Sequence, residues 1–281
     1  MTAIFTASAA PAADRHATCR RYLMCPPTYF EVAYAINPWM DPGRPAGRGR
    51  ALDQWESLRR AYARLGHQVD LVEPLPRQPD MVFAANGALV LDGKVFGSRF
   101  RDEQRAAEAP TYMRWFGAAG FHDVREPEHV CEGEGDLLAV DGLILAGMGF
   151  RTDPAAHREA QEYFGRPVIS LQLADPRYYH LDTALAVLDD ENVAYYPAAF
   201  SPGSRQVLRR LFPDATIATD ADAAAFGLNL VSDGHNVVLP IHATGLARTL
   251  RERGYEPVPV DVSELLKAGG SVKCCTLEIR G

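Results

Sequence analysis

Four stretches of the chain share one hydrophobic pattern, in which two short apolar runs flank a turn that contains Asp or Gly. Such paired runs predict β-hairpins. Each hairpin is followed by a stretch of helical periodicity that ends at Gly or before Pro, and then by one further short apolar run. The four hairpins begin at Asn86, Gly135, Leu181 and Leu228.

A fifth copy of this unit is divided between the two ends of the chain. The apolar run 271–280 would pair with the run 20–27, and a helix over 51–66 followed by a strand over 67–75 would complete the unit. The units recur at intervals of about 45–50 residues, which is typical of propellers and repeat arrays. We therefore predict an α/β fold, a five-bladed α/β-propeller whose hairpin-helix-strand repeats close into a ring around a channel. An ordinary α/β sandwich, with hairpins alike by chance, is the alternative.

The split unit joins both ends of the ring, so we predict a single domain over residues 20–281. The Ala-rich segment 1–19 precedes it, and we expect this segment to be flexible. The segment 26–49 is long and rich in aromatic residues, Pro and Gly. Segments of this length without secondary structure are usually lids or disordered loops, and the aromatic residues favour a lid.

Composition narrows the functional classes. The chain has 281 residues and a formal net charge of −7, and it carries no block rich in Lys and Arg, which argues against a nucleic-acid surface. It shows neither an apolar run long enough to cross a membrane nor the pattern of a signal peptide, so we expect a cytoplasmic protein. The five cysteines include no CxxC pair, which argues against a disulfide framework and a zinc site. The sequence leaves a homo-oligomer open.

Polar residues recur at the same phase of the repeats, where each hairpin opens. Glu132 follows Asn86 by 46 residues, and His180 follows Glu132 by 48. A closed ring would bring these residues together in one pocket with Asp182 and Cys274. A thiol, an imidazole and carboxylates are the groups of nucleophilic catalysis with a general acid and base.

Each of these residues also has a purely structural interpretation. A cysteine in a strand is usually a small buried apolar residue, a single His is more often structural, Asn86 fits a turn, and Glu132 fits a solvated loop. Their shared phase favours the catalytic interpretation. Of the adjacent pair Cys274 and Cys275, strand alternation would point one thiol into the channel, and the phase favours Cys274.

The chain resembles the guanidino-modifying enzymes of the pentein fold, which include arginine deiminases, dimethylarginine dimethylaminohydrolases and amidinotransferases. The resemblance extends over nearly the whole chain from Arg20. Its motifs are VFAANGALV around Asn86, EGEGD from Glu132, HLDT from His180 and GGSVKCCT around Cys274. It implies that Cys274 is the nucleophile, His180 the general acid and base, and Glu132 the carboxylate that supports His180.

The same resemblance implies a set of substrate-binding residues. Asp182 would hold guanidinium nitrogens, Arg105 and Arg151 the substrate carboxylate, and Asp80 the amino-acid end of the substrate. Asn86 would line the same pocket. No metal or other cofactor is implied.

Asn86, the motif EGxGD from Glu132 and the run MCPPTYFEVAYAINPWM together most resemble the arginine dihydrolase branch, which releases ornithine, CO2 and two ammonia from L-arginine. Asp182 suits the unsubstituted guanidinium nitrogens of that substrate. The alternative is a dimethylarginine dimethylaminohydrolase or an arginine deiminase, each of which releases citrulline. Amidino transfer to an amine also stays open. A third class, a non-catalytic binding ring of this fold, would have an unreactive Cys274.

Overall fold

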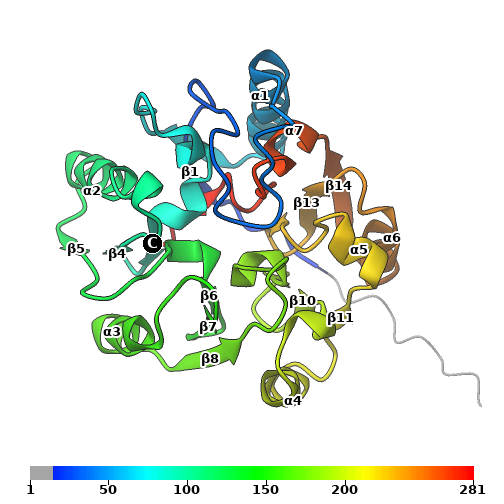
Figure 1. Cartoon of the computed structure of the whole chain (residues 1–281). Helices are drawn as coiled ribbons and strands as arrows, with labels where there is room; N and C mark the ends of the chain where they lie inside the picture. The colour runs from blue at the N-terminus through cyan, green and yellow to red at the C-terminus, as the bar shows by residue number, and fades with distance from the viewer. Residues whose placement is uncertain (1–14) are drawn as a thin grey trace, which may run out of the picture.

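Five three-stranded sheets stand around a common axis, with helices on the outside of the ring (Figure 1). This computed structural model describes residues 15–281. Within them, each sheet joins an antiparallel pair of strands to a third strand that is parallel to the middle one. The five-bladed propeller is therefore confirmed, and the α/β sandwich is excluded.

The strands are short and follow the predicted order. They are β1 (Arg21–Met24), β2 (Gln68–Leu71), β3 (Ala88–Leu91), β4 (Lys94–Gly97), β5 (Asp123–Arg125), β6 (Leu137–Val140), β7 (Leu143–Met148), β8 (Val168–Gln172), β9 (Leu185–Val187), β10 (Val193–Tyr195), β11 (Thr216–Ile217), β12 (Val231–Ser232), β13 (Asn236–Pro240), β14 (Glu256–Val260) and β15 (Leu277–Glu278). The helices are α1 (Arg48–Arg64), α2 (Glu108–Ala118), α3 (Pro154–Phe164), α4 (Pro202–Leu211), α5 (Asp220–Ala224), α6 (Thr244–Glu252) and α7 (Ser263–Leu266).

The split fifth unit closes the ring. Tyr22 of β1 lies opposite Glu278 of β15 in the antiparallel pair and opposite Val69 of β2 in the parallel pair. Helix α1 connects β1 to β2, as the equivalent helices do in the other units. Its buried side chains, Trp55, Leu58 and Tyr62 among them, recur at helical spacing. Burying one such side chain contributes roughly 1.5–3 kcal/mol, so closure and helix packing stabilise each other.

Local sequence sets where the helices begin and end. In α3, the side chain of Asp153 accepts a hydrogen bond from the amide of Ala155, and Pro154 occupies the first turn, where no donor is needed. Gly165 ends the helix with a φ of 64°, a conformation in which a glycine carries no steric penalty.

Two sequence predictions need correction. The run 271–280 is a strand only at β15, because Cys274 and Cys275 lie in a helical turn closed by the hydrogen bond from the amide of Cys275 to the carbonyl of Ser271. The short helices α5 and α7 were not predicted. Helix α5 begins with a capping box between Thr219 and Asp222, at the end of the run 215–220 that the pattern assigned to a strand.

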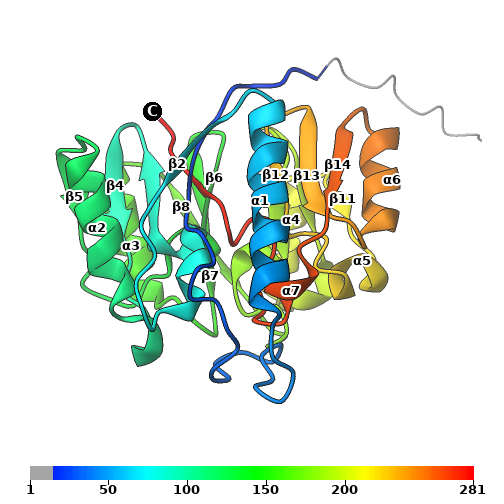
Figure 2. The same ribbon diagram turned by 90° about the horizontal axis from the view of Figure 1, so that it is seen from above.

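The segment 26–49 between β1 and α1 forms neither helix nor strand up to residue 47 and lies across one mouth of the ring (Figure 1). Figure 2 shows it at one end of the propeller and the C-terminus at the opposite end. The predicted flexible segment 1–19 is described only from residue 15. There, the amide of Thr18 donates to the carbonyl of Asp233, and Arg15 pairs with Asp189 at 2.5 Å.

Among residues 15–281, no helix combines the length and apolar character needed to cross a membrane.

Candidate active site

Three of the predicted site residues stand at equivalent short turns that lead into a hairpin. Glu132 immediately precedes the 3-10 turn Gly133–Gly135 before β6, and His180 immediately precedes the turn Leu181–Thr183 before β9. Asn86 lies within the turn Ala84–Gly87 before β3. The repeat therefore places each polar side chain at the same level of the ring, as its spacing predicted.

The motif EGEGD contains two glycines at positions where the structure has no room for a side chain. Gly133 has a φ of 53°, which favours glycine, and a Cβ there would meet the backbone of Ala85 at 2.7 Å. A Cβ on Gly135 would lie 2.3 Å from the side-chain nitrogen of Asn86 and 3.3 Å from the His180 ring. The absence of side chains at these positions lets two neighbouring units bring Asn86 and His180 close together.

His180 and Glu132 form a buried pair. The Nε2 of His180 lies 2.7 Å from Oε2 of Glu132, and Arg151 places Nη1 at 3.2 Å from the same oxygen. Burial alone would raise the pKa of the Glu132 carboxyl, but Arg151 and His180 outweigh it and hold the pKa well below its usual range. Glu132 is therefore an ionised carboxylate that orients the imidazole and stabilises positive charge on it.

The Cys274 thiol faces a carboxylate and an amide. Its Sγ lies 3.4 Å from Oδ2 of Asp182 and accepts a hydrogen bond at 3.1 Å from Nδ2 of Asn229. The amide of Cys274 in turn donates to Oδ1 of Asn229 at 3.1 Å. Cys274 thus faces the channel as predicted, although a turn and not strand alternation aims it there.

Burial has a strong effect on both acids of this pair. Burial, together with the nearby Asp182 carboxylate, raises the pKa of the Cys274 thiol well above its usual range. Burial also raises the pKa of the Asp182 carboxyl to about 6, against the opposing effect of His180 and Lys273. Oδ1 of Asp182 is buried and has no hydrogen-bond partner among residues 15–281. The site therefore holds an unused acceptor beside the thiol.

Arg105 lies among the site residues but is fully engaged by protein groups. It makes a two-pronged pair with Glu108 at 2.9 and 2.8 Å, and it donates to Oδ1 of Asn86 at 2.8 Å and to the carbonyl of Asp80 at 3.2 Å. Burial raises the pKa of the Glu108 carboxyl to about 7. The sequence analysis missed Glu108, although its position three residues after Arg105 was the available signal.

The segment 26–49 covers these residues. The hydroxyl of Tyr34 donates to Oδ2 of Asp80 at 2.9 Å, the carbonyl of Ile36 accepts from Arg151 at 2.8 Å, and Asn37 donates to the hydroxyl of Tyr179 at 3.3 Å. Beneath it, Cys274 is 2% exposed and His180 only 1%. We refer to residues 26–49 as the lid segment. It closes the site in this structure, so a substrate can enter only when the segment moves.

Asp136 also stands at the mouth but has a structural role. Its carboxylate accepts from the hydroxyl and amide of Thr152 at 2.7 and 3.2 Å and from the amide of Leu181 at 3.0 Å. These bonds fix the turn that carries His180. The sequence assigned no role to three residues that contact the site, Asn229, Tyr34 and Tyr179. Their contacts join units far apart in the chain, which a sequence pattern does not show.

The comparisons with known proteins agree with this geometry. The profile of a family described as "N,N dimethylarginine dimethylhydrolase, eukaryotic" matches residues 43–281. The chain belongs to this family. It is 56% identical to an N(G),N(G)-dimethylarginine dimethylaminohydrolase of Mycobacterium tuberculosis, over 95% of this chain and 88% of that protein.

A second relative carries a different activity in its name. The chain is 38% identical to the bifunctional arginine dihydrolase/ornithine cyclodeaminase AgrE of Nostoc sp., over 92% of this chain but only 38% of that longer protein. Among solved structures, the N-terminal domain of ArgZ, an arginine dihydrolase bound to its substrate, superposes with a TM-score of 0.89 at 36% identity. That match covers 93% of this chain and 98% of the domain. This member of the family is therefore a hydrolase that acts on guanidino C–N bonds.

Proposed function

We propose that this hydrolase converts L-arginine to ornithine, CO2 and two ammonia. The observation that carries the proposal is the buried, unpartnered Oδ1 of Asp182 beside the Cys274 thiol. An unsubstituted guanidinium presents N–H donors on every side, and a buried carboxylate is the acceptor that such donors need. A dimethylated nitrogen has no N–H to offer an acceptor placed there.

In the proposed mechanism, Cys274 attacks the guanidinium carbon as a thiolate. The C–S bond forms, and ammonia leaves with a proton from His180, giving a thiouronium bound to the enzyme. His180 then takes a proton from water, which attacks the same carbon, and the C–S bond breaks. Glu132 at 2.7 Å from His180 stabilises the imidazolium in each proton transfer.

The thiolate must be stabilised by the substrate. Burial and Asp182 raise the pKa of the Cys274 thiol in the free protein, so its thiol form dominates there. A guanidinium cation in the pocket reverses the sign of the nearby charge and favours the thiolate. The amide of Asn229, 3.1 Å from Sγ, adds a hydrogen bond to the charged form.

The release of ornithine requires a second cycle on the ureido group of citrulline, in which the Cys274 thiolate attacks the ureido carbon and the second ammonia leaves. Water then cleaves the C–S bond of the resulting thiocarbamate, and the carbamate so formed loses CO2 to give ornithine. We propose that Asn86 permits this second cycle, because an amide can lie beside the ureido oxygen without the repulsion that a carboxylate would cause. In this role, Arg105 positions Asn86 through the bond at 2.8 Å. Arg151 and Asp80 would hold the carboxylate and ammonium of the substrate, and Oδ1 of Asp80 is a second buried acceptor without a partner among the described residues.

The second candidate is hydrolysis of dimethylarginine to citrulline and dimethylamine. The relative from Mycobacterium tuberculosis favours it, since 56% of aligned residues are identical and its name states that activity. The relatives named as arginine dihydrolases are more distant, at 36–38% identity.

Product analysis separates the two candidates. The purified protein is incubated with L-arginine and separately with dimethylarginine, and the amino acids, ammonia and dimethylamine are quantified. Ornithine with two ammonia per arginine supports the proposal, whereas citrulline from dimethylarginine alone overturns it. In the first case, Asn86→Asp should stop the reaction at citrulline while the first cycle continues. Unchanged ornithine release from that variant would remove Asn86 from the mechanism.

A further inference from the structure

A second pocket opens at the end of the channel opposite the lid segment. The pocket itself has a volume of only about 70 Å³, but it adjoins a hollow of about 930 Å³, which lies in the range of ~300–1,000 Å³ usual for small-molecule sites. Arg20, Asp190 and Arg280 line both the pocket and the hollow. Lys273 and Thr276 line the pocket, but Cys274, His180 and Glu132 do not. The pocket is thus distinct from the site described above.

A network of paired charges separates the two sites. Lys273, the neighbour of Cys274, donates to Oε2 of Glu134 at 2.6 Å, and Arg280 pairs with Oε1 of the same carboxylate at 2.5 Å. The amide of Glu278 donates to Oε2 as well, at 2.8 Å. These groups are satisfied by one another, so they form the floor of the pocket and leave little capacity for a ligand.

The wall above this floor carries donors that the protein does not use. Arg20 reaches Glu278 only at 3.4 Å, and its Nε has no hydrogen-bond partner among residues 15–281. The hydroxyl of Tyr22, a fully buried residue that also lines the pocket, is likewise without a partner in that range. Unused buried donors are costly unless an acceptor completes them. A carboxylate is the acceptor best matched to a guanidinium.

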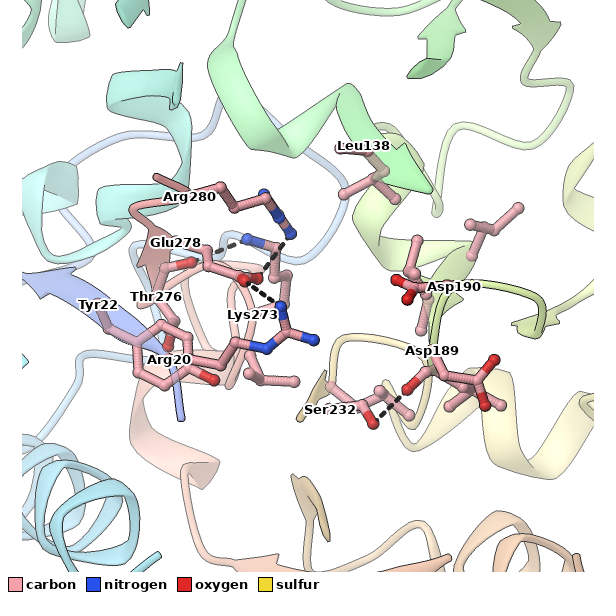
Figure 3. A pocket seen from close by; sticks show the side chains of 17 residues that line it. Arg20, Tyr22, Leu138, Asp189, Asp190, Ser232, Lys273, Thr276, Glu278 and Arg280 are labelled. Atoms are coloured by element: carbon pink, nitrogen blue, oxygen red, sulfur yellow. Dashed lines mark hydrogen bonds and ion pairs between the residues drawn. The ribbon is translucent and has the colours of Figure 1, made fainter. Parts of the chain in front are cut away.

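The opposite wall is acidic, and aliphatic side chains line part of the narrow pocket. Figure 3 shows Asp189 and Asp190 across an open space from the guanidinium of Arg20. Asp189 is engaged by Arg15 and by Tyr255, whereas Asp190 is exposed at the rim. Arg20 and Asp190 also both line the two adjoining hollows at this end of the ring. Aliphatic side chains complete the lining: Leu138, Leu185, Leu188, Leu230 and Val231.

We propose that this pocket binds a small α-amino acid with an aliphatic side chain. Its carboxylate pairs with Arg20, its ammonium pairs with Asp190, and its side chain enters the narrow pocket lined by the aliphatic residues. A cation on one wall, an anion on the other and aliphatic side chains in the narrow pocket match the three parts of such a zwitterion. The proposal does not depend on which guanidino substrate the active site takes.

Calorimetric titration of the full chain with L-leucine tests this site. We expect saturable binding that is weaker for 4-methylpentanoate, which lacks the ammonium, and for isoamylamine, which lacks the carboxylate. Arg20→Ala should lower leucine affinity by about ten-fold or more, as expected for loss of a charge-assisted hydrogen bond. Arg60→Ala, an exposed change on α1, is the matched control and should leave the affinity unchanged.

Further variants keep the test decisive. If Arg20→Ala does not fold, Arg20→Lys and Asp190→Asn should each still weaken binding. Cys274→Ser should bind leucine as the wild type does, so the result is separate from the catalytic proposal. Three outcomes would overturn the inference: no binding of leucine, binding that Arg20 and Asp190 variants do not affect, or binding of inorganic phosphate alone.

Discussion

The buried carboxylates at the two ends of the channel differ in whether their oxygens have hydrogen-bond partners. At the end away from the lid segment, both carboxylate oxygens of Glu134 are paired, with Lys273, Arg280 and the amide of Glu278. At the lid end, Asp80 and Asp182 each keep one buried oxygen without a partner among the described residues. Buried polar groups are normally satisfied, so the paired oxygens of Glu134 indicate a structural network, whereas the unpartnered oxygens of Asp80 and Asp182 indicate a ligand at the lid end.

The unpartnered carboxyls at the lid end also have raised pKa values. Burial raises the pKa of Asp80 and of Asp182, to about 6 in the latter, since few groups compensate for the lost water. These two groups destabilise the empty fold and are compensated when a guanidinium or an ammonium binds. The lid end is therefore built for a cationic substrate, at a cost to the stability of the free protein.

The largest effect that we predict falls on the nucleophile. Cys274→Ser should abolish turnover, because a serine hydroxyl cannot supply the thiolate that attacks the guanidinium carbon. Cys275→Ser is the matched control in the same turn, since Cys275 is a buried core residue. Both variants are checked by measuring turnover with a saturating concentration of the substrate, either arginine or dimethylarginine. Equal losses would mean that the thiol at 274 is not the reacting group.

A large loss of stability should follow from a change at the opposite end. Glu134→Gln leaves Lys273 without its buried counter-charge and leaves Arg280 with Glu278 alone, and breaking a buried pair costs about 3–5 kcal/mol. The free energy of unfolding from denaturant titration measures it, with the exposed Glu162→Gln on α3 as control. A loss as small as that of the control would show that the network adds little and would weaken the contrast between the two ends.

The sequence could predict the ring and the level of the site, but not the contacts between units. Spacing alone placed Asn86, Glu132 and His180 together, because equivalent turns of a repeat occupy equivalent positions. It could not show that Glu108 pairs with Arg105, or that Asn229 holds Cys274, since those contacts depend on side-chain directions. The strand predicted through Cys274 was wrong because local hydrogen bonds from Ser271 onward favour a turn.

Replacing Asp182 should change how stability depends on pH. A carboxyl whose pKa is raised from 3.8 to about 6 binds a proton more tightly in the folded state, so its contribution to stability falls as the pH rises from about 4 to 6. Asp182→Asn removes this term and should stabilise the protein at pH 8 by up to about 3 kcal/mol, with little gain near pH 4.

Thermal unfolding of Asp182→Asn at the two pH values checks this, with Asp53→Asn on the exposed face of α1 as control. Turnover should be lost in the same variant, because the acceptor for the guanidinium is gone. A variant that is less stable than the wild type at pH 8 would show that Asp182 supports the fold, and the two ends would then not differ as argued above.

The smallest predicted effect concerns how firmly the lid segment stays closed. The indole Nε1 of Trp39 donates to the carbonyl of Arg177 at 2.7 Å, and its ring packs edge-on against Phe226. Trp39→Phe removes this hydrogen bond, worth about 1 kcal/mol, so the open state should become several-fold more populated. The rate of Cys274 alkylation by a small thiol reagent should rise by the same factor. Trp115→Phe is the matched control, because its Nε1 makes a similar bond, to the carbonyl of Leu71, away from the lid. An equal rate in both variants would mean that closure depends on the bonds of Tyr34 and Asn37 to Asp80 and Tyr179, and not on Trp39.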